Sequence, residues 1–242
     1  MIIYLTSSPT GSLDDSKIVE GLDPDNEFIL NLERDIKDQA RILLISASPD
    51  DAAGNSEMGE FFADAFFEAG FNLAEFTVMD RQNNLPSSEI LSYDVIILGG
   101  GHIPTQMDFF YEIDLKETLS EYTGVLIGIS AGSMALAKVI YALPEYEDEF
   151  FNLFYTRFIP GLALTDYQII PHFNMNQDYI FEDVPLYDVV RADSCYWDFI
   201  ILTDGSYLRI EGEKKEVYGE SYLATNGEIL PLAKNGECKL LL

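Results

Sequence analysis

Short apolar runs, rich in β-branched residues, alternate in the first half of the chain with stretches in which apolar residues recur every three or four positions. The runs that predict strands cover residues 2–5, 42–45, 73–78, 95–98 and 125–129. Each run ends in a turn rich in Gly, Ser or Asp. Strands that alternate with helices are typical of an α/β fold, in which a mostly parallel sheet carries helices on both faces.

Two of the intervening stretches have the spacing of an amphipathic helix. The apolar positions that share a face are Met58, Phe61, Phe62, Ala65 and Phe66 in the first stretch, and Phe109, Phe110, Ile113 and Leu115 in the second. Residues three and four apart lie on one side of a helix, so this side is expected to face the sheet. We therefore expect the phenylalanines to belong to the core rather than to surround a cofactor.

The last forty residues follow a different pattern, in which short strands alternate with tight turns. The predicted strands cover residues 199–202, 207–210, 216–218 and 228–232, and the turns are Asp204-Gly205, Asn226-Gly227 and Asn235-Gly236. Asp-Gly and Asn-Gly favour tight turns between antiparallel strands, so we expect an antiparallel addition to the main sheet. The chain shows no repeat, low-complexity linker or break in composition, which predicts a single domain over residues 1–242.

The chain is strongly acidic, with 42 Asp and Glu against 14 Lys and Arg and a formal net charge of −28. Nucleic acids and anionic membranes are bound through clustered Lys and Arg, so neither is an expected partner. No apolar run approaches the roughly 18 to 20 residues of a membrane span, and residues 1–6 lack the basic region and cleavage site of a signal peptide. These features predict a cytoplasmic protein.

Cysteine and histidine are too scarce for a disulfide framework or a structural zinc site. The two cysteines, Cys195 and Cys238, do not form a Cys-x-x-Cys pair, and the chain has two histidines, His102 and His172. A structural zinc ion needs four such ligands held together. We therefore expect neither a metal nor a cofactor, and the sequence leaves the oligomeric state open between monomer and homodimer.

The most informative segment is Gly128-Ile-Ser-Ala-Gly132, which joins a buried strand to an Ala-rich helix. A strand, a sharp turn and a helix form the context of a nucleophile elbow, in which Ser130 is exposed on a strained turn. Its neighbours two residues away must be nearly free of side chains, and Gly128 and Gly132 meet that need. The amide of Ala131 and the start of the helix would then face an oxyanion. The same residues would also suit a serine that caps a helix.

A second glycine cluster, Gly99 to Gly101, is followed by His102 and lies after the apolar run at residues 95–98. It is therefore expected at the carboxyl end of a sheet strand, where α/β proteins place their ligand crevice. Its amides would complete an oxyanion hole. The cluster lacks the spacing of a dinucleotide fingerprint and the lysine of a phosphate loop, which argues against nucleotide binding.

An activated serine needs an imidazole base, and two histidines are available. His172 follows an apolar extended run and Pro171, downstream of the elbow, and is the favoured base. Two roles stay open for His102: it would face the pocket and help to bind substrate, or it would be a structural histidine whose hydrogen bonds are made within the protein. The carboxylate that orients the base is less determined: Asp204 lies in a sharply specified turn, while Asp166 and Asp178 are nearer to His172 in sequence.

Four motifs occur in a fixed order: Leu98-Gly-Gly-Gly101, Gly128-Ile-Ser-Ala-Gly-Ser133, Ile170-Pro-His172 and Thr203-Asp-Gly-Ser206. Over most of the chain, this series resembles the aspartyl dipeptidase (peptidase E) and cyanophycinase family of serine peptidases. The resemblance implies a three-layer fold similar to class I glutamine amidotransferases, in which serine replaces the elbow cysteine.

The resemblance also implies roles for individual residues. Ser130 would be the nucleophile, His172 the base and Asp204 the acid. The oxyanion and substrate-binding residues would be Gly100, Gly101 and Ala131, with His102 beside them. The implied activity is that of a serine exopeptidase, or dipeptidase, acting on a small peptide substrate without a cofactor.

Two departures from the family pattern bear on specificity. His102 replaces the usual Asn after the glycines, and no basic cluster follows His172; Arg157 and Arg191 are the two cations within twenty residues of it. The side-chain preference therefore stays open between aspartyl peptides and other small peptides. Cyanophycin, a polymer of aspartate and arginine, stays an alternative because an acidic protein would favour its guanidinium groups.

Two other classes of function stay open. An esterase of the α/β-hydrolase kind shares the Gly-x-Ser-x-Gly motif, but it has the acid before the histidine and the histidine near the chain end. Here about 70 residues follow His172, which argues against that class. A non-catalytic binding module would keep the fold, since fold alone does not imply activity. Reaction of Ser130 with a fluorophosphonate probe would separate an enzyme from such a module.

Overall fold

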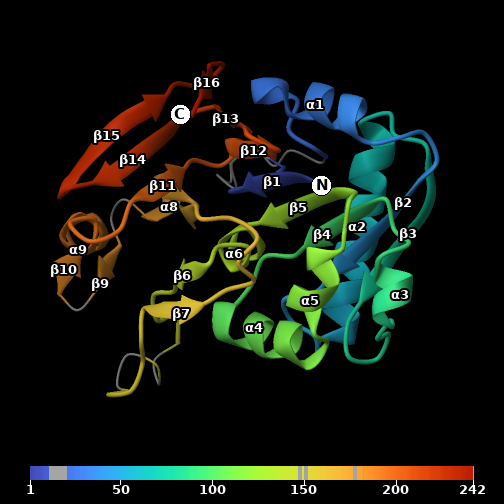
Figure 1. Cartoon of the computed structure of the whole chain (residues 1–242), viewed down its shortest axis with the longest axis horizontal. Helices are drawn as coiled ribbons and strands as arrows, with labels where there is room; N and C mark the ends of the chain where they lie inside the picture. Colours follow the sequence, from blue (N-terminus) through green and yellow to red (C-terminus); the bar gives the residue numbers. More distant parts are fainter. Residues whose placement is uncertain (11–20, 147–148, 150–151, 177–178, 182, 242) are drawn as a thin grey trace.

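The computed structural model describes residues 1–10, 21–146, 149, 152–176, 179–181 and 183–241. Five parallel strands form one side of an eight-stranded sheet, out to one of its edges (Figure 1): β1 (Ile2–Thr6), β2 (Ala40–Ile45), β3 (Leu73–Met79), β4 (Val95–Leu98) and β5 (Val125–Ile129). They lie in the order β1-β5-β4-β2-β3. The five apolar runs predicted to be parallel strands are therefore confirmed, within two residues at each end.

Helices cover both faces of this sheet, as the alternating pattern predicts. The helices packed on one face are α1 (Phe28–Asp35), which follows the short 3₁₀ turn η1 (Asp25–Glu27), and α2 (Ala52–Glu68). Those on the other face are α3 (Ser87–Ile90), α4 (Ile103–Glu112), α5 (Leu115–Ser120) and α6 (Ala131–Ala135). Phe62, Phe66, Phe109 and Phe110 are buried as expected, whereas Phe61 is 41% exposed.

The second predicted helix is wrong in its extent. Helix α4 ends at Glu112, and α5 begins at Leu115 after Asp114 adopts a left-handed conformation with φ of 49°. Phe109, Phe110 and Leu115 are nevertheless all fully buried. The apolar spacing thus correctly predicts which side chains face the sheet. It does not predict the break in the helix between Glu112 and Leu115.

The C-terminal strands divide between two sheets rather than forming one addition. The strands that extend the main sheet beyond β1 are β12 (Tyr207–Glu211), β13 (Lys214–Tyr218) and β16 (Cys238–Leu240), all antiparallel to their neighbours. A second, four-stranded sheet has the order β15-β14-β11-β8 and consists of β8 (Gln168–Ile170), β11 (Phe199–Leu202), β14 (Ser221–Thr225) and β15 (Glu228–Ala233). The turn at Asp204-Gly205 carries the chain from the second sheet into the first.

The remaining elements lie below or beside the second sheet in the view of Figure 1. They are the antiparallel pairs β6 (Val139–Tyr141) with β7 (Phe158–Pro160) and β9 (Ile180–Phe181) with β10 (Val184–Pro185), and helices α8 (Phe173–Asn176) and α9 (Leu186–Asp193). Ile169 and Ile200 of the second sheet share one core cluster with Leu5 and Leu98 of the first. This shared core supports the single domain, which stays a prediction for the whole chain. No helix within the described ranges has the length and apolar character to span a membrane.

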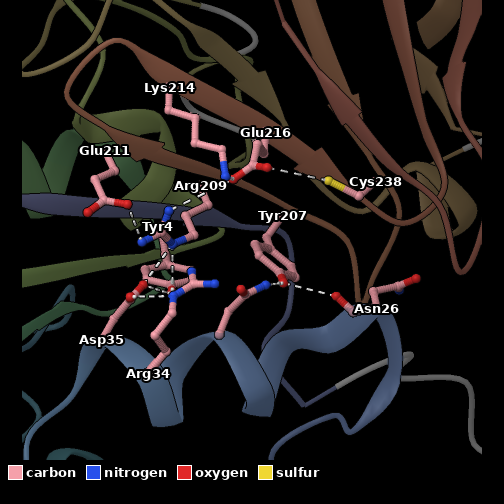
Figure 2. A network of polar contacts seen from close by, with 11 residues as sticks. Tyr4, Asn26, Arg34, Asp35, Tyr207, Arg209, Glu211, Lys214, Glu216 and Cys238 are labelled. Carbon is pink, nitrogen blue, oxygen red and sulfur yellow. Dashed lines mark hydrogen bonds and ion pairs between the residues drawn. The ribbon is translucent and has the colours of Figure 1, made fainter.

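A buried arginine links α1 to the main sheet through hydrogen bonds and ion pairs (Figure 2). Arg209 on β12 is 1% exposed, and its Nε donates a hydrogen bond of 2.7 Å to Asp35 Oδ2 at the end of α1. Its Nη2 donates to Glu211 Oε2 at 2.8 Å, and the Tyr4 hydroxyl of β1 donates to Asp35 as well. A buried charge is tolerated where it is paired and hydrogen-bonded, so this network holds α1 against β1 and β12.

The network also sets the ionisation of Asp35. Burial raises the pKa of this carboxyl, but the hydrogen bonds from Arg209, Tyr4 and Arg34 outweigh burial and hold the pKa below its usual value. A carboxyl with a lowered pKa in the folded state adds stability above its unfolded pKa and loses that stability as the pH falls through the folded value.

We predict that Asp35→Asn lowers the free energy of unfolding by about 3 kcal/mol at pH 7, because it leaves a buried guanidinium short of its anionic partner. The difference between wild type and variant should begin to shrink below about pH 4, the pKa of an aspartate in the unfolded chain, and should disappear as the pH falls through the lower pKa of the folded-state carboxyl. Urea unfolding measures both effects. Glu33→Ala, an exposed change on the same helix, is the control and should cost under about 0.5 kcal/mol. Equal costs for the two variants would contradict this account.

Candidate active site

Ser130 lies on a strained turn between β5 and α6. Its φ of 50° and ψ of −113° fall outside the regions that residues with side chains favour. Two glycines make the turn possible. A Cβ at Gly132 would lie 2.1 Å from the carbonyl oxygen of Leu98, and one at Gly128 would lie 2.6 Å from the backbone of Ser133. The sequence argument for small residues on both sides of Ser130 therefore has a direct steric basis.

The end of β1 anchors this turn. The N–H of Ser130 and the hydroxyl of Ser133 both donate to the carbonyl oxygen of Thr6, at 3.0 and 2.8 Å. The Thr6 hydroxyl donates in turn to the carbonyl oxygen of Gly128 at 2.7 Å. Helix α6 has only five residues, shorter than the Ala-rich segment suggests, so the position of Ser130 depends more on these bonds than on the helix.

His172 and Asp204 meet Ser130 from the second sheet. Strand β8 ends two residues before His172, and its parallel neighbour β11 ends two residues before Asp204. The side chains therefore emerge next to each other. His172 Nε2 lies 2.7 Å from Ser130 Oγ, and His172 Nδ1 lies 2.7 Å from Asp204 Oδ1. The Asp204 side chain is 1% exposed, while the His172 side chain is 23% exposed.

The structure thus brings together the three residues expected to form the catalytic group. The other two candidate acids are not part of this cluster. Asp166 is exposed and lines a separate cavity beside β15 and β16, and Asp178 lies outside the described residues. One residue that the sequence did not single out, Ser7, contacts both His172 and Asp204.

The glycine cluster lies directly against the serine, at the end of β4. A Cβ at Gly100 would lie 3.2 Å from the Cβ of Ser130, and Gly101 lines the cavity in front of it. Neither Gly100 nor Gly101 donates its N–H to any acceptor within the described ranges. Ala131 is the first residue of α6, so its N–H also lacks a partner within the helix. These amides are free to bind an oxyanion, although their role stays a prediction.

Ser130 and His172 open into a cavity of about 650 Å³. Its wall is mainly apolar and includes Met134, Tyr141 and Leu186. Among the described residues that line it, Glu145 supplies the one carboxylate, and none is Lys or Arg. The pKa of Glu145 lies above its usual value. Desolvation is the largest cause; the nearby His102 opposes the rise, and the charge of Glu149 adds to it.

His102 lines the same cavity, but both of its ring nitrogens contact the protein. Nδ1 lies 2.8 Å from Thr105 Oγ1, and Nε2 lies 2.8 Å from Glu149 Oε1. The other carboxylate oxygen of Glu149 accepts the N–H groups of Glu145 and Tyr146, at 2.9 and 3.2 Å. His102 therefore holds the segment that carries Glu145 at the cavity mouth. Its direct contact with substrate stays a prediction.

The ionisation of Glu149 fits this arrangement. Burial raises the pKa of Glu149, but the hydrogen bonds from the two N–H groups and from His102 outweigh burial and lower it below the usual value. Glu149 is thus an anion that holds the backbone of Glu145 and Tyr146. Across the described residues, no group of three or more His, Cys, Asp or Glu side chains is arranged to hold a metal ion.

The profile of peptidase family S51 matches residues 21–218 of the chain. Two solved structures share its fold. A peptidase from an acI-B1 Actinobacterium has a TM-score of 0.68 and 17% sequence identity, over 99% of this chain and 96% of that one. A candidate peptidase E from Listeria monocytogenes EGD-e has a TM-score of 0.57 and 16% identity, over 88% of this chain and 96% of that one. No curated protein matches the chain.

Proposed function

The chain belongs to peptidase family S51, and from that membership we propose that it is a serine dipeptidase that hydrolyses short peptides through Ser130, His172 and Asp204. The observation that carries the proposal is the continuous contact from Ser130 Oγ through the His172 ring to Asp204 Oδ1, with both distances at 2.7 Å. A serine that merely caps a helix would not need a buried carboxylate behind an imidazole.

The proposed reaction begins with proton transfer from Ser130 to His172. Nδ1–H of the neutral ring donates to Asp204, which leaves Nε2 free to accept the Ser130 proton. The alkoxide attacks the scissile carbonyl carbon, and the amides of Gly101 and Ala131 bind the resulting oxyanion. The imidazolium then protonates the leaving amine as the C–N bond breaks.

The second half of the reaction uses the same groups. His172 takes a proton from water, and the hydroxide attacks the acyl carbon on Ser130. As the ester C–O bond breaks, His172 returns that proton to the Ser130 oxygen, which releases the carboxylic acid product. Asp204 remains ionised throughout and stabilises the imidazolium each time it forms.

The cavity supports a small substrate. Its volume of about 650 Å³ lies within the range of sites that enclose small molecules. Glu145 is the one described carboxylate in its wall and meets no lysine or arginine there. We infer that the cavity disfavours an aspartyl side chain and favours a substrate with a cationic group, of the kind that arginyl peptides and cyanophycin carry.

We predict that the protein hydrolyses members of a library of dipeptides and aminoacyl amides, and that Ser130→Ala lowers kcat by on the order of 10⁶-fold. His172→Ala should be about as damaging, because the two residues act in one step, and the double variant should be no slower than either single one. Circular dichroism should show the fold of each variant intact. Turnover by Ser130→Ala at the wild-type rate would exclude Ser130 as the nucleophile.

We predict that Asp204→Asn lowers kcat by on the order of 10⁴-fold, because an amide favours the wrong tautomer of His172 and does not stabilise its cation. Asp166→Asn is the matched control and should change kcat by less than about twofold, since Asp166 lies outside the cluster. The assignment of the acid would be wrong if the control caused the larger loss.

We predict that Glu145→Gln raises KM for arginyl dipeptides by about fivefold, in keeping with a partly exposed ion pair of about 1 kcal/mol. KM for neutral dipeptides should stay constant, and Glu117→Gln, an exposed change on α5, should affect neither. Because the pKa of Glu145 is raised, acidification should remove the preference at a higher pH than for an ordinary glutamate. Equal KM changes for cationic and neutral substrates would contradict this assignment.

A further inference from the structure

Ser7 occupies an unusual position behind the proposed triad. It follows the last residue of β1 and is fully buried. Its hydroxyl accepts the backbone N–H of His172 at 2.8 Å and donates to Asp204 Oδ1 at 2.7 Å. That same Oδ1 lies 2.7 Å from His172 Nδ1. Ser7, His172 and Asp204 therefore form a closed ring of three hydrogen bonds.

The backbone of His172 needs such support. Its φ of 59° places it in the left-handed region, which costs a residue with a side chain about 1 kcal/mol or more and persists only where the surroundings hold it. The Ser7 hydroxyl binds the N–H of this residue and so fixes the point from which the imidazole extends. Ser7 is itself held in place, because its own N–H donates to the carbonyl oxygen of Ser206 at 3.3 Å.

The carboxylate of Asp204 is also poorly constrained without Ser7. Its other oxygen, Oδ2, is buried and has no hydrogen-bond partner among the described residues. The side chain is therefore oriented through Oδ1 alone, by Ser7 and by the imidazole. Loss of the Ser7 bond would leave the imidazole as the sole described donor to this carboxylate.

We propose that Ser7 is a positioning residue for His172 and Asp204, and that its hydroxyl sets the direction of His172 Nε2 toward Ser130. This inference rests on the proposed serine peptidase mechanism. Ser7 is not among the residues that line the cavity, so it acts on the reaction step and not on substrate binding. Displacement of a reacting group by up to about 1 Å is enough to slow a reaction by about 100-fold.

The test measures the reaction of Ser130 with a biotinylated alkyl fluorophosphonate, which requires no knowledge of the natural substrate. The rate constant of inactivation, kinact, should fall about 10- to 100-fold in Ser7→Ala, while the binding constant KI stays within about twofold of wild type. Ser7→Cys, which keeps the shape of the side chain with a somewhat larger atom and a weak S–H donor, should give an intermediate kinact. Ser8→Ala is the control: Ser8 is also buried, but its hydroxyl contacts Thr10 and should leave kinact unchanged.

The outcomes separate this inference from the proposed function. Failure of the wild-type protein to react would overturn the proposed function and the role of Ser7 with it. Reaction of the wild type with an unchanged kinact in Ser7→Ala would overturn the role of Ser7 alone. A rise in KI with constant kinact would do the same, because it would place Ser7 in binding. Thermal unfolding of each variant identifies any loss of fold. If Ser7→Ala reacts slowly because it is unfolded, Ser7→Cys decides instead. The inference then requires that the kinact of Ser7→Cys lie below that of wild type.

Discussion

The hydrogen bond between Ser130 Oγ and His172 Nε2 joins the main sheet to the second sheet. Ser130 follows β5 in the main sheet, and His172 follows β8 in the second sheet. The two sheets share one apolar core, so burial of this core fixes the distance between the ends of their strands. A change of about 1 Å in that packing would break the contact on which the proposed chemistry depends.

The two residues that make this contact also have strained backbones. Ser130 and His172 both have positive φ, and both are held by hydrogen bonds to the end of β1, through Thr6 and Ser7. Backbone strain persists only where the surroundings determine the conformation, and it is typical of functional sites. Strand β1 thus connects the proposed nucleophile to the proposed base, in addition to its role at the centre of the sheet between β5 and β12.

The fold was predictable from the sequence where the signal is local. Apolar runs mark the parallel strands, because strands buried on both faces need continuous apolar residues. The division of the C-terminal strands between two sheets was not predictable, because the pairing of β11 with β8 joins residues about thirty positions apart and has no local signature. Strands β14 and β16 were missed: residues 221–225 mix polar and apolar side chains, and β16 is a short exposed edge strand.

The candidate site, too, was predictable only where its sequence signal is local. The roles of Ser130 and Asp204 as nucleophile and acid stay predictions. Glycines specify the turns around Ser130 and at Asp204-Gly205, so these two turns could be predicted from the sequence. Ser7 could not, because its role depends on residues 165 and 197 positions away. The contact of His102 with Glu149, 47 residues away, was hidden for the same reason.

A crystal structure of the protein after reaction with a fluorophosphonate tests the central claim most directly. The account predicts a phosphonyl group on Ser130 Oγ, with one phosphoryl oxygen within hydrogen-bond distance of the amides of Gly101 and Ala131. His172 should then lie beside the adduct and keep its contact with Asp204. An adduct on another residue, or a phosphoryl oxygen that faces away from both amides, would contradict it.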